Sequence, residues 1–189
     1  MKRLTLPLAC FALVVACRAQ DNPAPMPAHE AGVTTAVLPD ETRAISHNGQ
    51  TFLLASSTKG PNVETEEYLL RGEKLAEWSQ LLTMQRLTLE NPSTPDEFAA
   101  YFQKRVNQEG GARLELIQQS KAAAVFAVHF AKSEQNEEQV MVCLVLADKG
   151  GSLNLVQFAI KPARLMPEVV AAQLKSWKTK FTQQAAAAK

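Results

Sequence analysis

The sequence predicts an α+β fold in which a twisted, mainly antiparallel sheet is flanked by two helices, an α/β/α sandwich. Short runs rich in β-branched, aromatic and aliphatic residues are separated by turn residues along most of the chain. Two later segments instead repeat apolar residues at helical spacing. The most apolar strands would carry apolar residues on both faces, which indicates that each face of the sheet is covered.

The folded part is predicted to open with a β-hairpin. Residues 41–46 and 50–56 are extended runs, and Asn48-Gly49 between them suits the positive φ angles of a tight turn. Two further strands follow, at residues 63–70 and 79–89.

The first helix is expected after these strands. Thr94 can cap it, Pro95 suits the first helical position, and Glu97 can reach back to complete a capping box. Gly110-Gly111 ends the helix. Its buried face comprises Phe98, Phe102 and Val106.

A four-strand meander is predicted next, at residues 113–119, 122–131, 139–147 and 152–161. If its second and third strands pair around the loop at 132–138, their side chains divide between two apolar faces. The expected first face holds Phe126, Val128, Phe130, Val140, Val142 and Leu144. The expected second face holds Ala127, His129, Met141, Cys143 and Val145.

The last helix is predicted from Pro167 to about Gln183, followed by an alanine-rich tail at residues 184–189. Its lysines lie largely off its apolar stripe, so the helix should pack on the sheet. The stripe comprises Val170, Leu174, Trp177 and Phe181.

The N-terminus is typical of an export signal. Lys2 and Arg3 precede a mostly apolar run, which is shorter than the about 20 residues a membrane-spanning helix needs. The sequence Val14-Val15-Ala16-Cys17 resembles a lipobox, so Cys17 is predicted to be the lipidated first residue of the mature protein. The alternative is cleavage after Ala19, which would release a soluble periplasmic protein.

These features divide the chain into a signal peptide (1–16), a lipidated N-terminus with a proline-containing tether (17–39), one globular domain (40–183) and the tail (184–189). By resemblance to Gram-negative lipoproteins, Arg18 in place of an aspartate implies sorting to the periplasmic side of the outer membrane.

The charge balance and the cysteines limit the classes of partner and of covalent cross-link that we expect. Removal of the signal would leave 18 basic and 19 acidic side chains, a balance that disfavours nucleic acid as a partner. No disulfide is expected, because Cys10 would leave with the signal and Cys17 would carry lipid. Cys143, in a run of valines and leucines, should be a buried thiol.

No catalytic motif stands out. His129 and Cys143 could approach one another on adjacent strands, but a buried thiol favours packing over catalysis. Neither a metal site nor a cofactor site is indicated. Glu66, Glu67 and Glu73 lie on or near one predicted strand. Trp78 follows in an irregular segment, where its ring either packs a loop onto the core or lines a recognition groove. The candidate binding surface is therefore Glu66, Glu67, Glu73 and Trp78.

Residues 67–83 resemble a pattern of uncharacterised secreted bacterial proteins, in which E-Y, G-E, W and T recur at similar intervals; here these are Glu67-Tyr68, Gly72-Glu73, Trp78 and Thr83. Residues 140–160 resemble their long paired strands. More remotely, the order of strands, helix, meander and helix is similar to the Mog1/PsbP-like sandwich, whose members include small bacterial lipoproteins. The resemblance implies a binding or assembly module and names no substrate.

We therefore expect a lipid-anchored, non-catalytic module that binds a periplasmic protein. It could be an accessory factor of an envelope or secretion machine, or an immunity protein against a toxin. The alternative is an enzyme or small-ligand carrier acting on envelope material. Its site would lie in a groove between sheet and helix, near Glu73, Trp78 or His129.

Overall fold

The computed structural model describes residues 34–89, 93–109, 111–133 and 137–188. The predicted signal peptide, the lipidation site Cys17 and the tether up to residue 33 lie outside the described residues, so these remain predictions.

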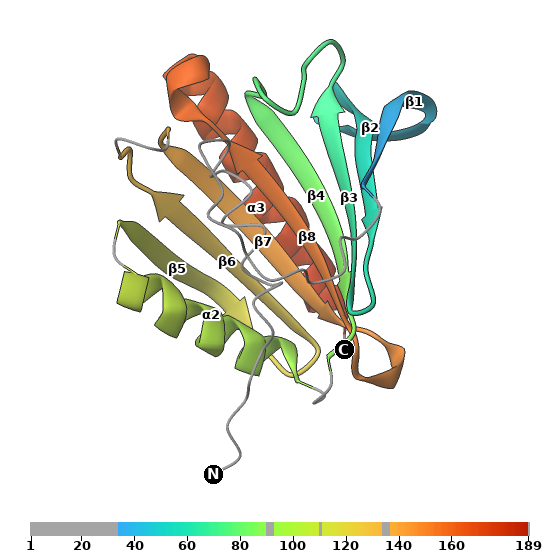
Figure 1. Ribbon diagram of the computed structural model, residues 1–189. Helices are drawn as coiled ribbons and strands as arrows, with labels where there is room; N and C mark the ends of the chain where they lie inside the picture. Colours follow the sequence, from blue (N-terminus) through green and yellow to red (C-terminus); the bar gives the residue numbers. More distant parts are fainter. Residues whose placement is uncertain (1–33, 90–92, 110, 134–136, 189) are drawn as a thin grey trace, which may run out of the picture.

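The described residues form the predicted α+β fold, an eight-stranded sheet with two α-helices (Figure 1). The strand order is β1-β2-β3-β4-β8-β7-β6-β5, and neighbouring strands pair antiparallel. The strands are β1 (Thr34–His47), β2 (Gln50–Lys59), β3 (Val63–Leu70), β4 (Gln80–Leu87), β5 (Ala112–Gln119), β6 (Ala123–Phe130), β7 (Gln139–Ala147) and β8 (Leu153–Ile160). The helices are α2 (Pro95–Glu109) and α3 (Pro167–Ala187), with 3-10 turns at Lys149–Gly151 and Pro162–Arg164.

The first hairpin is confirmed. His47 pairs with Gln50, and the two turn residues have positive φ angles, 49° at Asn48 and 74° at Gly49. β1 begins earlier than expected, because Thr34 already pairs with Thr58. The first strand therefore includes residues 34–39, which the sequence assigned to the tether.

The N-terminus of α2 has half of the expected capping box. The Glu97 carboxylate accepts a hydrogen bond from the backbone N–H of Thr94, at 2.9 Å. The predicted apolar face of the helix is also confirmed. Phe98, Phe102 and Val106 all pack into the core between α2 and the sheet.

The pairing of β6 with β7 differs from the expected one by a single residue. Phe126 lies opposite Cys143, and Val128 lies opposite Met141. Phe126 and Cys143 therefore share a face, whereas the sequence analysis put them on opposite faces. A one-residue slip exchanges the two faces of a strand, and two uniformly apolar strands contain nothing that selects between the registers.

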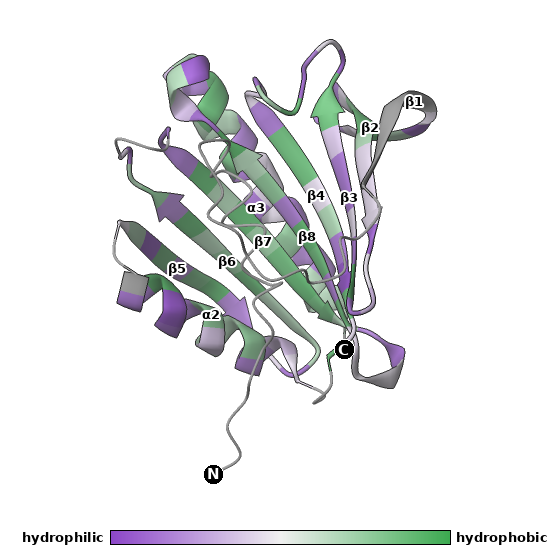
Figure 2. Cartoon of the chain, viewed as in Figure 1, coloured by the Kyte–Doolittle hydropathy of each residue, from purple (hydrophilic) through white to green (hydrophobic). Residues whose placement is uncertain are grey.

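Both faces of the central sheet are buried, as predicted. α2 packs on one face beside β5, β6 and β7, and α3 packs on the other. Figure 1 shows α3 behind the strands, and Figure 2 shows hydrophobic residues concentrated on the central strands. The largest fully buried side chains of the core on the α3 side are Phe52, Phe158, Trp177 and Phe181.

α3 continues to Ala187, four residues beyond its predicted end. Ala185 is 3% exposed and packs in the core. Part of the alanine run predicted as a tail therefore belongs to α3 and contributes to the core. Alanine has the highest helix propensity, which favours this extension. No helix in the described part of the chain is both long and apolar enough to cross a membrane.

Candidate functional site

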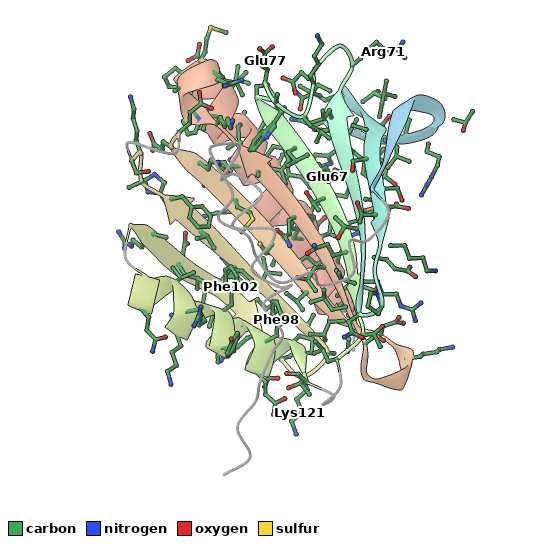
Figure 3. The ribbon with its side chains drawn as sticks, in the orientation of Figure 1. Glu67, Arg71, Glu77, Phe98, Phe102 and Lys121 are labelled. Atoms are coloured by element: carbon green, nitrogen blue, oxygen red, sulfur yellow. The ribbon has the colours of Figure 1, made fainter. Side chains whose placement is uncertain are left out.

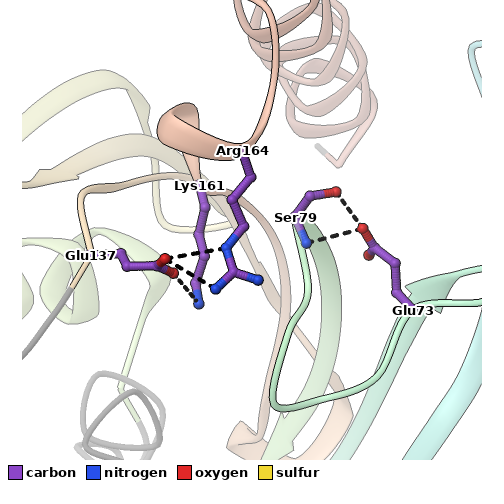
Figure 4. A network of polar contacts seen from close by, with 5 residues as sticks. All are labelled: Glu73, Ser79, Glu137, Lys161 and Arg164. Carbon is purple, nitrogen blue, oxygen red and sulfur yellow. Dashed lines mark hydrogen bonds and ion pairs between the residues drawn. The ribbon is translucent and has the colours of Figure 1, made fainter.

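The sheet has an N-terminal half, β1 to β4, and a C-terminal half, β5 to β8. Loops from the two halves meet where β4 begins and β8 ends. The backbone N–H of Lys161, just after β8, donates to the carbonyl of Ser79, just before β4, at 2.9 Å. The β3–β4 loop (71–79) and the segment leading into α3 (161–166) therefore leave the sheet side by side. We call these two segments, with residues 137–138 before β7, the β4–β8 end (Figure 4).

Lys161 is the buried centre of this end. It is 9% exposed, and its ammonium lies 4.5 Å from the centroid of the Trp78 ring. The same ammonium is 2.7 Å from Oε2 of Glu137. Burying an ammonium is unfavourable unless nearby groups compensate for the loss of water. Here the Glu137 carboxylate supplies the counter-charge, and the Trp78 ring supplies a cation–π contact.

Glu137 joins Lys161 to the turn before α3. Its Oε1 accepts hydrogen bonds from Nε of Arg164 at 3.2 Å and from the terminal guanidinium nitrogen at 3.0 Å. The hydrogen bond from Lys161, and then that from Arg164, lower the pKa of the Glu137 carboxyl, so it remains charged at neutral pH. One carboxylate thus binds two cations.

Glu73 fixes the β3–β4 loop internally. Its Oε1 accepts hydrogen bonds from the Ser79 hydroxyl and from the Ser79 backbone N–H, the latter at 3.0 Å. Two turns shape the rest of the loop, with Glu73 N–H donating to the Leu70 carbonyl and Glu77 N–H to the Lys74 carbonyl. The loop is held at its base and folded within itself, which preorganises its outer residues.

The outer residues of the β4–β8 end are exposed and partly apolar. Leu75 is 42% exposed and Met166 is 61% exposed, and both stand out among the large hydrophobic side chains of the described chain. Arg71, Lys74 and Glu77 are exposed around Leu75, and Figure 3 shows Arg71 and Glu77 at this end of the sheet. An apolar centre with a charged rim is the usual anatomy of a protein interface.

The structure separates the acidic residues predicted to form a binding surface. Glu66 lies on the α3 side of β3, where it pairs with Arg43 and accepts a hydrogen bond from the Tyr68 hydroxyl at 2.6 Å. Glu67 lies on the opposite face, in register with Thr83. Glu73 lies in the loop, so of these three carboxylates only Glu73 belongs to the β4–β8 end.

The different environments of Glu66 and Glu67 shift the pKa values of their carboxyls in opposite directions. Burial raises the pKa of Glu66, but hydrogen bonds from Tyr68 and Arg43 outweigh it and the net pKa is lowered. Burial also raises the pKa of Glu67, and a hydrogen bond with Ser56 offsets only part of this. Burial and the Glu66 carboxylate raise the pKa of Tyr68 to about 12.

Trp78 serves the core, with its ring 5% exposed and packed on the α2 side. His129 and Cys143 form no dyad. His129 is exposed and bonds Glu138 at 2.6 Å, whereas Cys143 is buried on the α2 side, where burial raises the pKa of its thiol. A thiol held in its protonated form is a poor nucleophile.

The β4–β8 end can therefore present a surface, but the charged groups at its base already bind one another or the backbone. Both cations bind Glu137, and the Glu73 carboxylate binds Ser79. Within residues 34–89, 93–109, 111–133 and 137–188, no three His, Cys, Asp or Glu side chains gather in a way that could hold a metal ion.

Sequence reasoning missed Glu137, Lys161 and Arg164. Glu137 lies in a polar loop and Lys161 directly follows an apolar strand, so neither stands out in the sequence. Only the pairing of β8 between β4 and β7 brings them together. The one available signal was Lys161 itself, a charged residue adjoining a strand with apolar residues on both faces.

A protein-family model matches residues 38–189, which include both α-helices and all strands from within β1 onwards. That family is uncharacterised. No curated protein and no solved structure gives a significant match.

Proposed function

The chain belongs to this uncharacterised family, and we propose that it is a non-catalytic module of the bacterial envelope that binds a protein partner through the β4–β8 end. One observation carries the proposal. Leu75 and Met166 are exposed on segments that leave adjacent strands, and these segments are joined by the buried Trp78 and Lys161 and the half-buried Glu137. Apolar anchors on a preorganised base contribute most of the binding energy in many protein interfaces.

The proposal includes the membrane anchor. Lipid on Cys17 would hold the domain on the periplasmic side of the outer membrane, so its partner would be an envelope protein. The proposed Mog1/PsbP-like character of the sandwich agrees with this role, since such folds mostly serve as binding or assembly modules.

The anchor is tested by the intact mass of membrane-extracted protein, comparing the wild type with Cys17→Ser. We expect residues 17–189 plus lipid for the wild type, and loss of lipid and of membrane retention for the variant. A lipid-free chain beginning at Gln20 would contradict the anchor and leave the docking proposal to be tested in the soluble periplasm.

The docking surface is tested by capture of envelope proteins with the wild type and with Leu75→Ser/Met166→Ser. Because each side chain would fill a partner pocket, we expect the double variant to weaken capture of a specific protein at least about tenfold. Met84→Ser is the matched control, since Met84 is 37% exposed but lies within β4. Absence of any specific partner, or equal capture by the double variant, would contradict the proposal.

A further inference from the structure

β5 is an edge strand of the sheet formed by the described residues, three strands away from β8. Among the described strands, only β6 pairs with β5, and Figure 1 shows β5 at the border of the sheet. An edge strand presents a row of free backbone donors and acceptors, which proteins usually protect or use for pairing. The opposite edge, β1, is interrupted by two register shifts, between Ala36 and Asp40 and between Asp40 and Ala44. β5 runs regularly from Ala112 to Leu116.

The hydrogen-bond pattern shows which residues of β5 face outward. The N–H of Ala131 donates to the carbonyl of Gly111 at 2.8 Å, so Gly111 and Ala131 form a hydrogen-bonded position of the β5–β6 ladder. These positions alternate along antiparallel strands, so Arg113 and Glu115 also direct their backbone groups to β6. The backbone groups of Ala112, Leu114 and Leu116 therefore point out from the edge.

We propose that β5 pairs antiparallel with β5 of a second copy of this chain, in a register centred on Leu114. Leu114 then exchanges two backbone hydrogen bonds with its own copy, and Ala112 does so with the copy of Leu116. Arg113 lies opposite the copy of Glu115 at a position without hydrogen bonds, where facing side chains are closest. The two-fold axis makes this ion pair twice.

Charge selects this register over its neighbours. A shift that pairs Ala112 with the copy of Leu114 sets Arg113 against Arg113. The opposite shift, which pairs Leu114 with the copy of Leu116, sets Glu115 against Glu115. Like charges directly opposite are unfavourable, so of these three registers only the one centred on Leu114 is complementary.

The side chains on the two faces of β5 fit the same pairing. Glu115 lies on the α3 side, where it accepts a hydrogen bond from Lys178 at 2.9 Å and is still 63% exposed. Arg113 is exposed and has no ion-pair partner among the described residues. On the α2 side, Leu116 is 38% exposed, and the paired strand would cover it. The register shift between Leu116 and Gln118 confines the regular edge to the five residues used here.

Charge reversal tests the pairing in the full chain carrying Cys17→Ser, which removes the interference of lipid. Sedimentation velocity over a concentration series should show a monomer–dimer equilibrium. We expect Arg113→Glu to raise the dimer dissociation constant at least about tenfold, because two attractive pairs become repulsive. The combined Arg113→Glu/Glu115→Arg should restore dimerisation. Lys178→Gln is the control for loss of the bridge within one chain, and it should leave the dimer intact.

Cysteine cross-linking tests the register in the same chain with Cys10→Ser added. A mixture of Arg113→Cys and Glu115→Cys chains should form a disulfide-linked dimer under mild oxidation, because these positions would face each other. Neither variant alone should form it. A monomer at all concentrations, no rescue by the charge swap, or efficient cross-linking of either variant alone would overturn the proposal.

Discussion

The two halves of the sheet differ in what covers them. In the C-terminal half, α2 and α3 pack on opposite faces of β5, β6 and β7, and all of residues 123–128 are buried. In the N-terminal half, β3 buries only Tyr68 and Leu69, and its Glu64 and Glu66 pair with cations at the surface. One continuous sheet therefore contains a meander that supplies most of the core and a more polar half with an exposed β3–β4 loop.

The difference shows how the fold can tolerate an exposed apolar loop. Core burial stabilises the chain mainly where both faces of the sheet are covered. The β4–β8 end lies at the junction of the halves, with Trp78 and Ser79 from one and Glu137 and Lys161 from the other. Leu75 lies in a loop that is fixed at its base by Glu73 and Ser79, and it is 42% exposed, so it contributes little to the core.

The largest expected effect is at Trp177, whose ring packs in the core on the α3 side against residues from both halves of the sheet. Its ring stacks on Phe158 at 5.0 Å between centroids and contacts Phe181 at 5.3 Å. Trp177→Ala should lower the free energy of unfolding by about 3–5 kcal/mol, because it leaves a large cavity. Urea denaturation followed by circular dichroism measures it.

Trp177→Phe is the matched control for this prediction. The buried indole N–H has no hydrogen-bond partner among the described residues, so removing it sacrifices no hydrogen bond. We expect a loss well below that of the alanine variant. A Trp177→Ala loss under about 1 kcal/mol would show that the core on the α3 side does not dominate the stability.

A smaller effect is expected at the junction. Glu137→Gln leaves the buried Lys161 ammonium without its counter-charge and should cost about 1–2 kcal/mol, less than a fully buried pair because Glu137 is 41% exposed. Lys161→Met removes the cation instead of stranding it, and should cost less. Thermal melts of both variants make the comparison, and equal losses would mean that the frame acts by packing alone.

The junction should also depend on pH. Lys161 and Arg164 lower the pKa of Glu137 in the folded chain, so the stabilisation is complete at neutral pH. It is lost as pH falls from the carboxyl's ordinary value, 4.5, through the lower folded value. The difference in unfolding free energy between wild type and Glu137→Gln should therefore shrink in acid.

The sequence predicted most elements of both halves because turns and apolar periods are local signals. Asn48-Gly49 is confirmed as a turn, and the Glu97 half of the predicted capping box is confirmed. It failed where the register between strands, or the meeting of distant segments, had to be known. The faces of β7 were exchanged relative to those of β6, because uniformly apolar strands contain nothing that selects their register. The contact of Glu137 with Lys161 was missed because it joins a loop to the end of a strand far along the chain.

The smallest expected effect is a gain in the N-terminal half, at Glu67. Burial raises the pKa of this carboxyl above its unfolded value, so the folded chain holds the proton more tightly than the unfolded chain does. Stability from this group is complete below the unfolded pKa and declines as pH rises through the folded one. Glu67→Gln keeps a neutral side chain that can still bond Ser56. It should raise the melting temperature at pH 7 and leave it nearly unchanged near pH 4, as followed by calorimetry. An equal change at both pH values would mean that packing, and not the buried charge, distinguishes this half from the meander.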